Sequence, residues 1–154
     1  MISVITVTYN NYDDLHRTLH SLENVDGIES VVVNGGNCDK TKKLLSDFAG
    51  TSISEPDKGI SDAFNKGVSL ATGENVMFLN SGDILLSPKY LKEAEKIINC
   101  NPEISFVHSD SLFEDRFSGT IYMEPLKSLF FNDAPLGRGM PFNHLTMVCL
   151  LYTS

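Results

Sequence analysis

Cysteine is scarce in this sequence, and the cysteines present are not spaced for a structural site. The chain has three, Cys38, Cys100 and Cys149, an odd number in which no two form a C-x-x-C pair. This pattern argues against a disulfide framework and against a zinc site, and it favours a reducing compartment. We therefore expect a cytoplasmic protein.

Basic residues are also in the minority. Lys and Arg number 12 against 20 Asp and Glu, which gives a formal net charge of −8. A chain with this balance has no basic footprint for the phosphates of nucleic acid, so nucleic acid is not an expected partner.

Long apolar runs are absent as well. The longest, Met147–Leu151, falls far short of the about 20 residues that cross a bilayer. The first residues, Met1–Thr6, are apolar with no basic region before them, which indicates a strand rather than a signal peptide. Any association with the inner face of the plasma membrane is expected to run through partners.

Several common catalytic and phosphate-binding motifs are missing. There is no G-x-G-x-x-G after the first expected strand, no G-x-x-x-x-G-K-[ST] loop and no G-x-S-x-G elbow. A Rossmann dinucleotide site, a P-loop and a serine hydrolase are therefore not indicated. The four histidines show no ligand-like clustering, and we assign His16 and His20 to a solvated helix face.

The pattern that is present predicts an α/β protein. The 154 residues, 42% of them hydrophobic, suit one domain. Short β-branched runs alternate with stretches of helical spacing, which predicts a largely parallel sheet with helices on both faces. Strands are expected at residues 2–7, 31–33, 76–79 and 104–107, and helices at 13–22, 41–48, 62–71 and 88–98. Further on, we expect a β-excursion around residues 117–122 and a Pro/Gly-rich loop at 133–143 over the sheet.

Polar residues follow each of the expected strands. The segments are Thr8–Asn10, Asn34–Gly36, Asn80–Asp83 and Ser109–Asp110. In open α/β sheets, ligands bind outside the carboxyl ends of the strands. Any one segment is explained as well by an ordinary polar loop. Together, with an aromatic ring in one and a lone carboxylate in another, they favour a nucleotide and a divalent cation.

Five segments occur in an order that is highly specific. They are VITVTYN (4–10), VVVNGGNCDKT (31–41), SEPDKGISDAFNKG (54–67), ATGE (71–74) and FLNSGD (78–83). The sequence thereby resembles family 2 glycosyltransferases, especially the bacterial branch that builds capsule, colanic-acid-like and other surface polysaccharides. The resemblance covers roughly residues 1–148. It implies the GT-A fold, a Rossmann-like and mostly parallel sheet that carries a sugar-transfer site.

The resemblance places a nucleotide-sugar donor at the first two strand ends. Tyr9 matches the aromatic that stacks on the base in this family, with Thr8 and Asn10 beside it, and a flat ring with a polar tip suits that role. Asn34, next to Gly35, stands where the family usually has an Asp that pairs with the base, and an amide can both donate and accept there. An ordinary half-buried tyrosine is the alternative for Tyr9. The base stays open between UDP- and GDP-type donors.

The fifth segment resembles the family's metal site. The usual pattern is Asp-x-Asp-Asp, and here Asn80, Ser81 and Gly82 precede Asp83. The carboxylate retained is the one that holds Mn²⁺ or Mg²⁺ against the diphosphate in this family, and diphosphate oxygens with water can complete the shell of such a hard cation. His144 is a further candidate ligand. The alternative for Asp83 is a turn-forming role.

The third segment matches the family's donor-side loop and helix start. Lys58 and Lys66 are candidates for contacts with phosphate. Asp57 and Asp62 are candidates for hydrogen bonds to ribose or sugar hydroxyls. A solvated run of charges is the alternative.

An inverting transfer also needs a base that takes the proton of the acceptor hydroxyl. The family carries this carboxylate on a helix past the segment that resembles residues 141–144, and no acidic residue follows His144 here. We therefore expect the N-terminal part of a single catalytic domain, residues 1–148, with the C-terminal part missing and an atypical, foreign-looking tail at 149–154. Asp110, after the fourth expected strand, is the remaining candidate base.

The expected function is transfer of a sugar from a nucleotide-diphospho-sugar to a saccharide or lipid-linked acceptor. One alternative is a module that binds the donor but transfers no sugar, because it lacks the base. The other is a doubly wound signalling domain of the flavodoxin kind, against which the order of the five segments argues.

Overall fold

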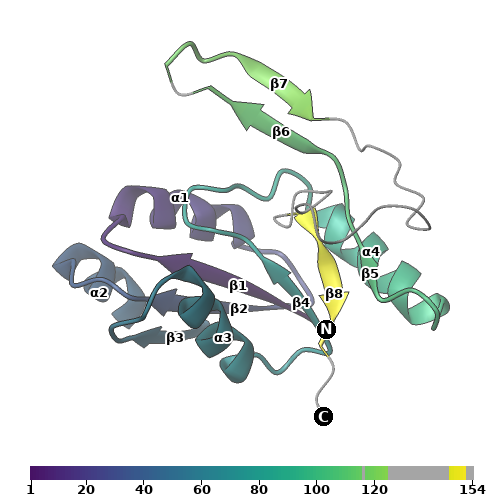
Figure 1. The fold of residues 1–154 in the computed structure, drawn as a ribbon, viewed down its shortest axis with the longest axis horizontal. Coiled ribbons are helices and arrows are strands. Elements are labelled where there is room, and N and C mark those ends of the chain that lie inside the picture. Colours follow the sequence, from purple (N-terminus) through teal and green to yellow (C-terminus); the bar gives the residue numbers. More distant parts are fainter. Residues whose placement is uncertain (116, 125–145, 152–154) are drawn as a thin grey trace.

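A six-stranded sheet organises the chain, in the order β3-β2-β1-β4-β8-β5, beside a separate two-stranded sheet of β6 and β7 (Figure 1). The computed structural model describes residues 1–115, 117–124 and 146–151. The helices are α1 (Tyr12–Leu22), α2 (Asp39–Ser46), α3 (Ile60–Leu70) and α4 (Pro88–Cys100). The strands are β1 (Ile2–Thr8), β2 (Ile28–Asn34), β3 (Thr51–Ser54), β4 (Asn75–Phe78), β5 (Phe106–Val107), β6 (Ser111–Glu114), β7 (Ile121–Glu124) and β8 (Val148–Leu150). None of the described helices is long and apolar enough to span a membrane.

β1 lies inside the sheet and pairs in parallel with β2 on one side and β4 on the other. In this register Val4 is opposite Ser30 of β2 and Met77 of β4. β3 continues the parallel run beyond β2, whereas β8 is antiparallel to both β4 and β5. β5 therefore runs in the same direction as β4. The carboxyl ends of all the parallel strands lie at one edge of the sheet.

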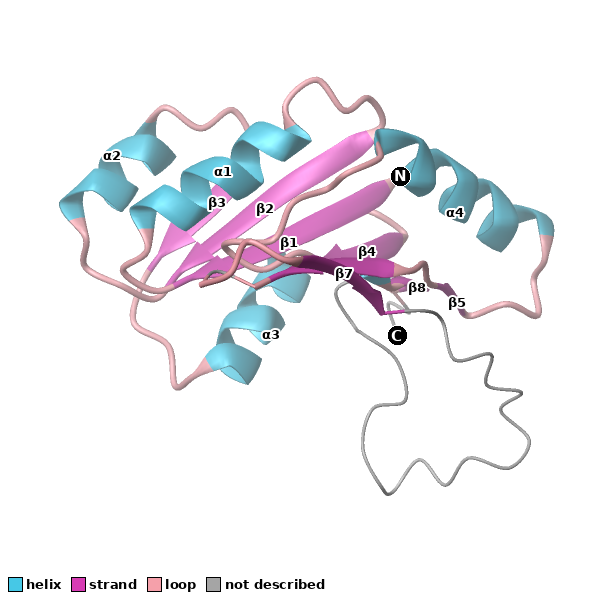
Figure 2. Ribbon diagram, turned by 90° about the horizontal axis from the view of Figure 1, so that it is seen from above, coloured by secondary structure: helices cyan, strands magenta, loops and turns pink. Residues whose placement is uncertain are grey.

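Helices cover both faces of the sheet, which confirms the predicted α/β architecture. α1, α2 and α4 lie on one face and α3 on the other (Figure 2). Successive side chains of a strand point to opposite faces. Val4 accordingly packs in a cluster with Leu91 of α4, while Ile5 belongs to a cluster that Phe64 of α3 covers. Because both faces of β1 are covered, six of its seven residues are buried, the polar Ser3, Thr6 and Thr8 among them.

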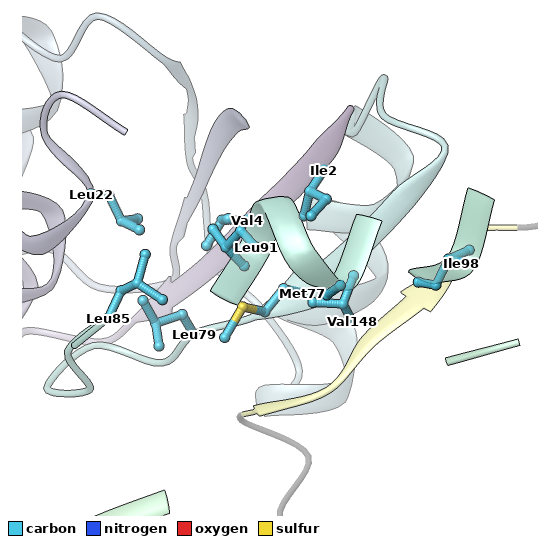
Figure 3. Close-up of a cluster of buried hydrophobic side chains, with 10 residues drawn as sticks. Ile2, Val4, Leu22, Met77, Leu79, Leu85, Leu91, Ile98 and Val148 are labelled. Carbon is cyan, nitrogen blue, oxygen red and sulfur yellow. The ribbon is translucent and has the colours of Figure 1, made fainter. Parts of the chain in front are cut away.

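The largest buried cluster lies between the sheet and α4. Its members are Ile2, Val4, Leu22, Met77, Leu79, Leu85, Leu91, Ala94, Ile98 and Val148. Burial of one large aliphatic side chain contributes about 1.5–3 kcal/mol. Figure 3 shows Leu85, from the loop after β4, close to Leu22 of α1. The loop that leaves the sheet at β4 is therefore tied to the core by an apolar side chain.

Two strands of the main sheet are not predicted by the sequence pattern. β3 has four residues, Thr51–Ser54, for which the sequence pattern predicts no element. β8 inserts antiparallel between β4 and β5, and Val148 within it is fully buried. The strand includes Cys149 and Leu150, and the domain boundary expected at residue 148 stays a prediction. The loop expected at 133–143 lies outside the described residues.

The β-excursion is confirmed as a hairpin that stands off the main sheet (Figure 1). β6 and β7 pair antiparallel, and the amide of Asp115 donates to the carbonyl of Thr120 at 2.9 Å across the turn. The rings of Phe113 and Tyr122 stack on one face, with centroids 5.5 Å apart. The hairpin follows β5 directly, so it rises from the carboxyl edge of the sheet.

A carboxylate ties three segments together at the opposite edge. Glu29 of β2 accepts hydrogen bonds from the hydroxyl of Ser3, and from the backbone N–H and hydroxyl of Thr72 at 2.7 and 3.0 Å. Partial burial alone would raise the pKa of Glu29, but these hydrogen bonds outweigh it and lower the pKa below the ordinary 4.5. The ATGE segment thus links β1, β2 and the start of β4.

Glu29→Gln is expected to lower the free energy of unfolding by about 1–2 kcal/mol at neutral pH, the size of hydrogen bonds to a partly exposed charge. Because folding lowers the pKa of Glu29, its contribution is complete above pH 4.5 and is lost as the pH falls through the folded-state pKa. Urea unfolding from neutral to acidic pH measures this, with the exposed Glu103→Gln as control. A difference from wild type that stays constant with pH would contradict the assignment.

Candidate functional site

Hydrogen bonds join the loops at the carboxyl edge of the sheet. The amide of Gly35, just after β2, donates to Thr8 of β1 at 3.0 Å. The amide of Ser81, after β4, donates to Val7 at 3.2 Å, and the hydroxyl of Thr8 lies 3.4 Å from that of Ser81. Strand pairing thus continues into the loops. The segments predicted after β1, β2 and β4 are side by side.

Tyr9 and Asn10 follow β1 and differ in their surroundings. Tyr9 is 71% exposed, so its ring can receive a flat ligand without displacing core residues. Asn10 has a φ of +52°, and its Oδ1 accepts the backbone N–H groups of Asn37 and Cys38 at 2.8 and 3.0 Å. Asn10 therefore holds the loop between β2 and α2 in place. Its contact with a donor stays a prediction.

Asn34, at the end of β2, is fully buried. Its Oδ1 accepts the N–H of Gly36 at 3.0 Å, and its Nδ2 donates to the hydroxyl of Ser54 on β3 at 3.2 Å. The amide thereby shapes the glycine turn and links β2 to β3. Since Asn34 exposes no surface, its contact with a base stays a prediction, and the geometry favours a role in supporting the turn.

Asp57 reaches the end of β2 from the loop between β3 and α3. A Cβ atom on Gly35 would lie 1.8 Å from Oδ2 of Asp57, so this carboxylate lies directly against the glycine. Its Oδ1 accepts the N–H of Gly59 at 2.9 Å. The structure therefore brings Gly35 and Asp57 together, and this close approach explains why position 35 has no side chain.

The charges around the start of α3 largely bind one another. The Nζ of Lys66 lies 2.8 Å from Glu55 and 3.5 Å from Asp62. Its hydrogen bond to Glu55 raises the pKa of Lys66, and the N–H of Lys58, donating at 3.0 Å, lowers the pKa of Asp62. Lys66 is thus engaged within the protein, whereas the side chain of Lys58 is exposed. Contacts of these residues with a donor stay predictions.

The segment after β4 forms a tight turn around Asp83. Its Oδ2 accepts the N–H of Asn80 at 3.1 Å, and its own N–H donates to the carbonyl of Asn80 at 2.9 Å. Gly82 has a φ of +106°, in the region that favours glycine. The N–H of Gly82 donates to the hydroxyl of Thr18, on α1, at 2.9 Å. Thr18 is not among the residues predicted from the sequence, although a hydroxyl in the apolar stripe of α1 is a usable indication.

The oxygen atoms of this turn fit a hard divalent cation. Asp83 supplies a half-buried carboxylate, and Oδ1 of Asn80 is buried without a hydrogen-bond partner. An unpaired buried oxygen is costly unless a ligand, ion or water satisfies it. In the part of the chain that the structure describes, no three His, Cys, Asp or Glu residues gather to hold a metal. A cation here would therefore need further ligands from a diphosphate and water.

Asp110 and His144 are the remaining predicted site residues. Asp110 is exposed on the segment between β5 and β6, and β8 separates β5 from β4 in the sheet. His144 lies outside the described residues. The roles predicted for both stay predictions.

The family model described as "Glycosyl transferase family 2" matches residues 3–150. The chain belongs to this family. The match extends from β1 into β8, so it covers the whole main sheet as well as the five segments that carry the resemblance. The polar loops at the carboxyl edge of the sheet lie within the segments that resemble glycosyl transferase family 2.

Relatives and solved structures agree with this membership. An uncharacterized glycosyltransferase of Mycobacterium tuberculosis is 35% identical over 111 residues, which cover 68% of this chain and 42% of that protein. The mannosyltransferase PcManGT of Pyrobaculum calidifontis, in complex with GDP-Man and Mn²⁺, gives a TM-score of 0.60 at 25% identity over 74% of this chain and 35% of that one. TarS of S. aureus, with UDP-GlcNAc, gives 0.56 at 26% identity over 64% and 31%. This chain therefore matches less than half the length of each of these proteins.

Asn10→Gly is expected to lower the free energy of unfolding by about 0.5–1.5 kcal/mol, because two backbone N–H groups lose their acceptor. Asn10→Ala should cost ~1–2 kcal/mol more, since alanine is strained in the left-handed region and glycine is not. Asn10→Asp keeps the acceptor and should stay near wild type. Chemical unfolding of the three variants measures this. Equal stability of the Gly and Ala variants would contradict the backbone argument.

Proposed function

We propose that this protein is a glycosyltransferase whose donor is a nucleotide-diphospho-sugar of UDP or GDP type and whose acceptor is a saccharide or a lipid-linked saccharide. The observation that carries the proposal is the meeting of three strand-end loops at one sheet edge. One of these loops presents the exposed ring of Tyr9, and another presents the carboxylate of Asp83. An aromatic shelf and an oxygen ligand on one rigid edge suit a base and a metal-bound diphosphate.

Two structural neighbours support the donor class. PcManGT was solved with GDP-Man and Mn²⁺, and TarS with UDP-GlcNAc. Because one carries a guanine and the other a uracil nucleotide, both donor types stay in the proposal. The relative from M. tuberculosis has a glycosyltransferase name without a stated substrate, so the sugar and the acceptor rest on chemistry alone.

In the proposed complex the base stacks on Tyr9, the ribose lies near Asp57, and the diphosphate lies near Lys58 and Asp83. The supporting residues around them are Thr8, Asn10, Asn34, Gly35, Asp62, Lys66, Asn80, Ser81 and Gly82. Lys66 is paired with Glu55 and Asp62, so its charge is already balanced within the protein. A cation at Asp83 would supply attraction for the diphosphate in its place.

Asp83, with Oδ1 of Asn80, would hold Mn²⁺ or Mg²⁺. When bound, the cation neutralises the charge that develops on the leaving diphosphate. Transfer with inversion also requires that an acceptor oxygen attack the anomeric carbon from the face opposite the diphosphate while a base takes its proton. Among residues of this chain, Asp110 is the proposed candidate for that base, and His144 for a further metal ligand.

The second candidate function is donor binding without transfer. It requires only the strand-end loops that the structure brings together, whereas transfer also requires a positioned base. The two functions share the donor site and differ only in the acceptor step. They are therefore separated by measuring binding and transfer independently.

UDP or GDP with Mn²⁺ is expected to stabilise the protein by about 2.7 kcal/mol at a ligand concentration of ~100 Kd. Tyr9→Ala should weaken nucleotide binding about tenfold, because one base loses its stacking partner. Asp83→Asn should remove only the part of the stabilisation that depends on Mn²⁺. Thermal unfolding with titrated nucleotide and metal measures all three effects.

Tyr122→Ala is the matched control, because that exposed tyrosine lies on β7 and not in the loops that follow β1, β2 and β4. Its nucleotide affinity should equal that of wild type. No stabilisation by any common nucleotide would reject the donor site. Equal stabilisation with and without Mn²⁺ would count against Asp83 as a metal ligand.

We expect slow release of UDP or GDP from nucleotide-sugars and little acceptor-dependent transfer by the 154-residue chain. A positioned base contributes ~10²–10⁴-fold to such a reaction, whereas hydrolysis by water needs only the donor site. The assay follows nucleotide release from a panel of nucleotide-sugars with and without lipid-linked acceptors. Robust acceptor-dependent transfer would contradict this prediction. In that case Asp110→Asn should lower transfer and leave nucleotide affinity unchanged.

A further inference from the structure

Helix α1 contacts the loop that carries Asp83 at two points. Thr18, which is fully buried, accepts the N–H of Gly82 through its hydroxyl at 2.9 Å. The same hydroxyl lies 3.1 Å from the carbonyl of Asp14 and 3.3 Å from that of Asn80, so its proton has two acceptors within reach. One turn of helix later, Ser21 accepts the N–H of Leu85 at 3.1 Å.

These two contacts lie on either side of Asp83. Gly82 immediately precedes it, and Leu85 follows two residues later. The side chain of Leu85 is also buried beside Leu22 of α1 (Figure 3). The loop is thus fixed to α1 on both sides of the carboxylate, by one hydroxyl before it and by a hydroxyl and an apolar side chain after it.

We propose that Thr18 is a positioning residue for the metal-binding carboxylate, with Ser21 in a supporting role. Thr18 touches neither donor nor cation in this proposal. It holds the left-handed turn at Gly82, and that turn sets the direction in which Asp83 and Asn80 present their oxygens. The inference rests on the proposed function, because it assumes that Asp83 binds Mn²⁺ or Mg²⁺ together with the diphosphate.

Loss of the hydrogen bond between Gly82 and Thr18 would be unfavourable, and this is the physical reason for the proposed role. The N–H of Gly82 is partly buried, and without Thr18 it must turn toward water or stay unpaired. Either response rotates the peptide next to Asp83, whose Oδ2 already receives the N–H of Asn80. The affinity of a carboxylate for a cation depends strongly on how its oxygens are oriented. Hydrogen bonds that orient the residues around a metal therefore change its affinity.

The test compares isosteric and conservative variants of the full 154-residue chain. Thr18→Val keeps the shape and removes the hydroxyl, whereas Thr18→Ser keeps the hydroxyl. Ser21→Ala removes the second contact. Ser69→Ala is the matched control, because Ser69 donates to the carbonyl of Asn65 on α3 in the same helical geometry, away from the loop.

The readout is the coupling between metal and nucleotide, measured by calorimetry as the ratio of the Kd for UDP, or GDP, without and with Mn²⁺. Thr18→Val should lower this ratio about tenfold while the metal-free Kd stays that of wild type. Thr18→Ser should retain the ratio, Ser21→Ala should lower it less, and Ser69→Ala should not change it. In the unliganded protein, the amide of Gly82 should exchange with deuterium faster in Thr18→Val.

A double-variant cycle separates positioning from stability. If Thr18 acts through Asp83, Thr18→Val has no further effect on the ratio once Asp83→Asn is present. The inference would be overturned if a folded Thr18→Val kept the wild-type ratio while Asp83→Asn abolished the effect of Mn²⁺ on the Kd. The proposed function would then still hold. Should Thr18→Val fail to fold, an unchanged ratio in Ser21→Ala would overturn the inference instead. Absence of coupling in wild type would reject the metal site itself, and the inference with it.

Discussion

The parallel pairing of β1 with β2 and β4 is the constraint on which the rest of the structure depends. It places β1 inside the sheet, where Val4 and Ile5 have no exposed surface on either face. It also brings the carboxyl ends of the strands to one edge. Since the pairing continues into the loops through the amides of Gly35 and Ser81, the spacing of the loops follows the spacing of the strands.

Polar side chains complete the rigidity of that edge: Thr18 and Asn34 are fully buried, whereas Asn10 is exposed. Thr18 receives the N–H of Gly82, Asn34 that of Gly36, and Asn10 those of the residues at the start of α2. Each satisfies backbone groups that regular strand pairing leaves unpaired. These side chains therefore hold loop conformations with left-handed or glycine-dependent turns. The polar residues that remain at the surface, such as Tyr9, are available for a ligand.

An acidic protein that binds an anionic donor needs positive charge at the binding site. The net charge is −8, and Lys66 is engaged by Glu55 and Asp62. Where Lys66 is already paired, a divalent cation would supply attraction for a diphosphate. Under the proposed function, metal binding thus complements the pairing of Lys66. Lys58, in the loop before α3, is exposed.

The sequence by itself determined the family, the α/β class and the elements with strong patterns. The stripe of α1 repeats at helical spacing, and β1 is a short run rich in β-branched residues that ends at a polar turn. Tertiary structure alone decided where β8 lies, because a three-residue strand carries almost no period and Val148 pairs with Met77 from far along the chain. It likewise decided that Asn34 is buried and that Thr18 holds the Asp83 turn. Ser54 and Gly82, which are hydrogen-bond partners of these two side chains, are distant from them in the sequence. They come within bonding distance only when the sheet and its helices have packed.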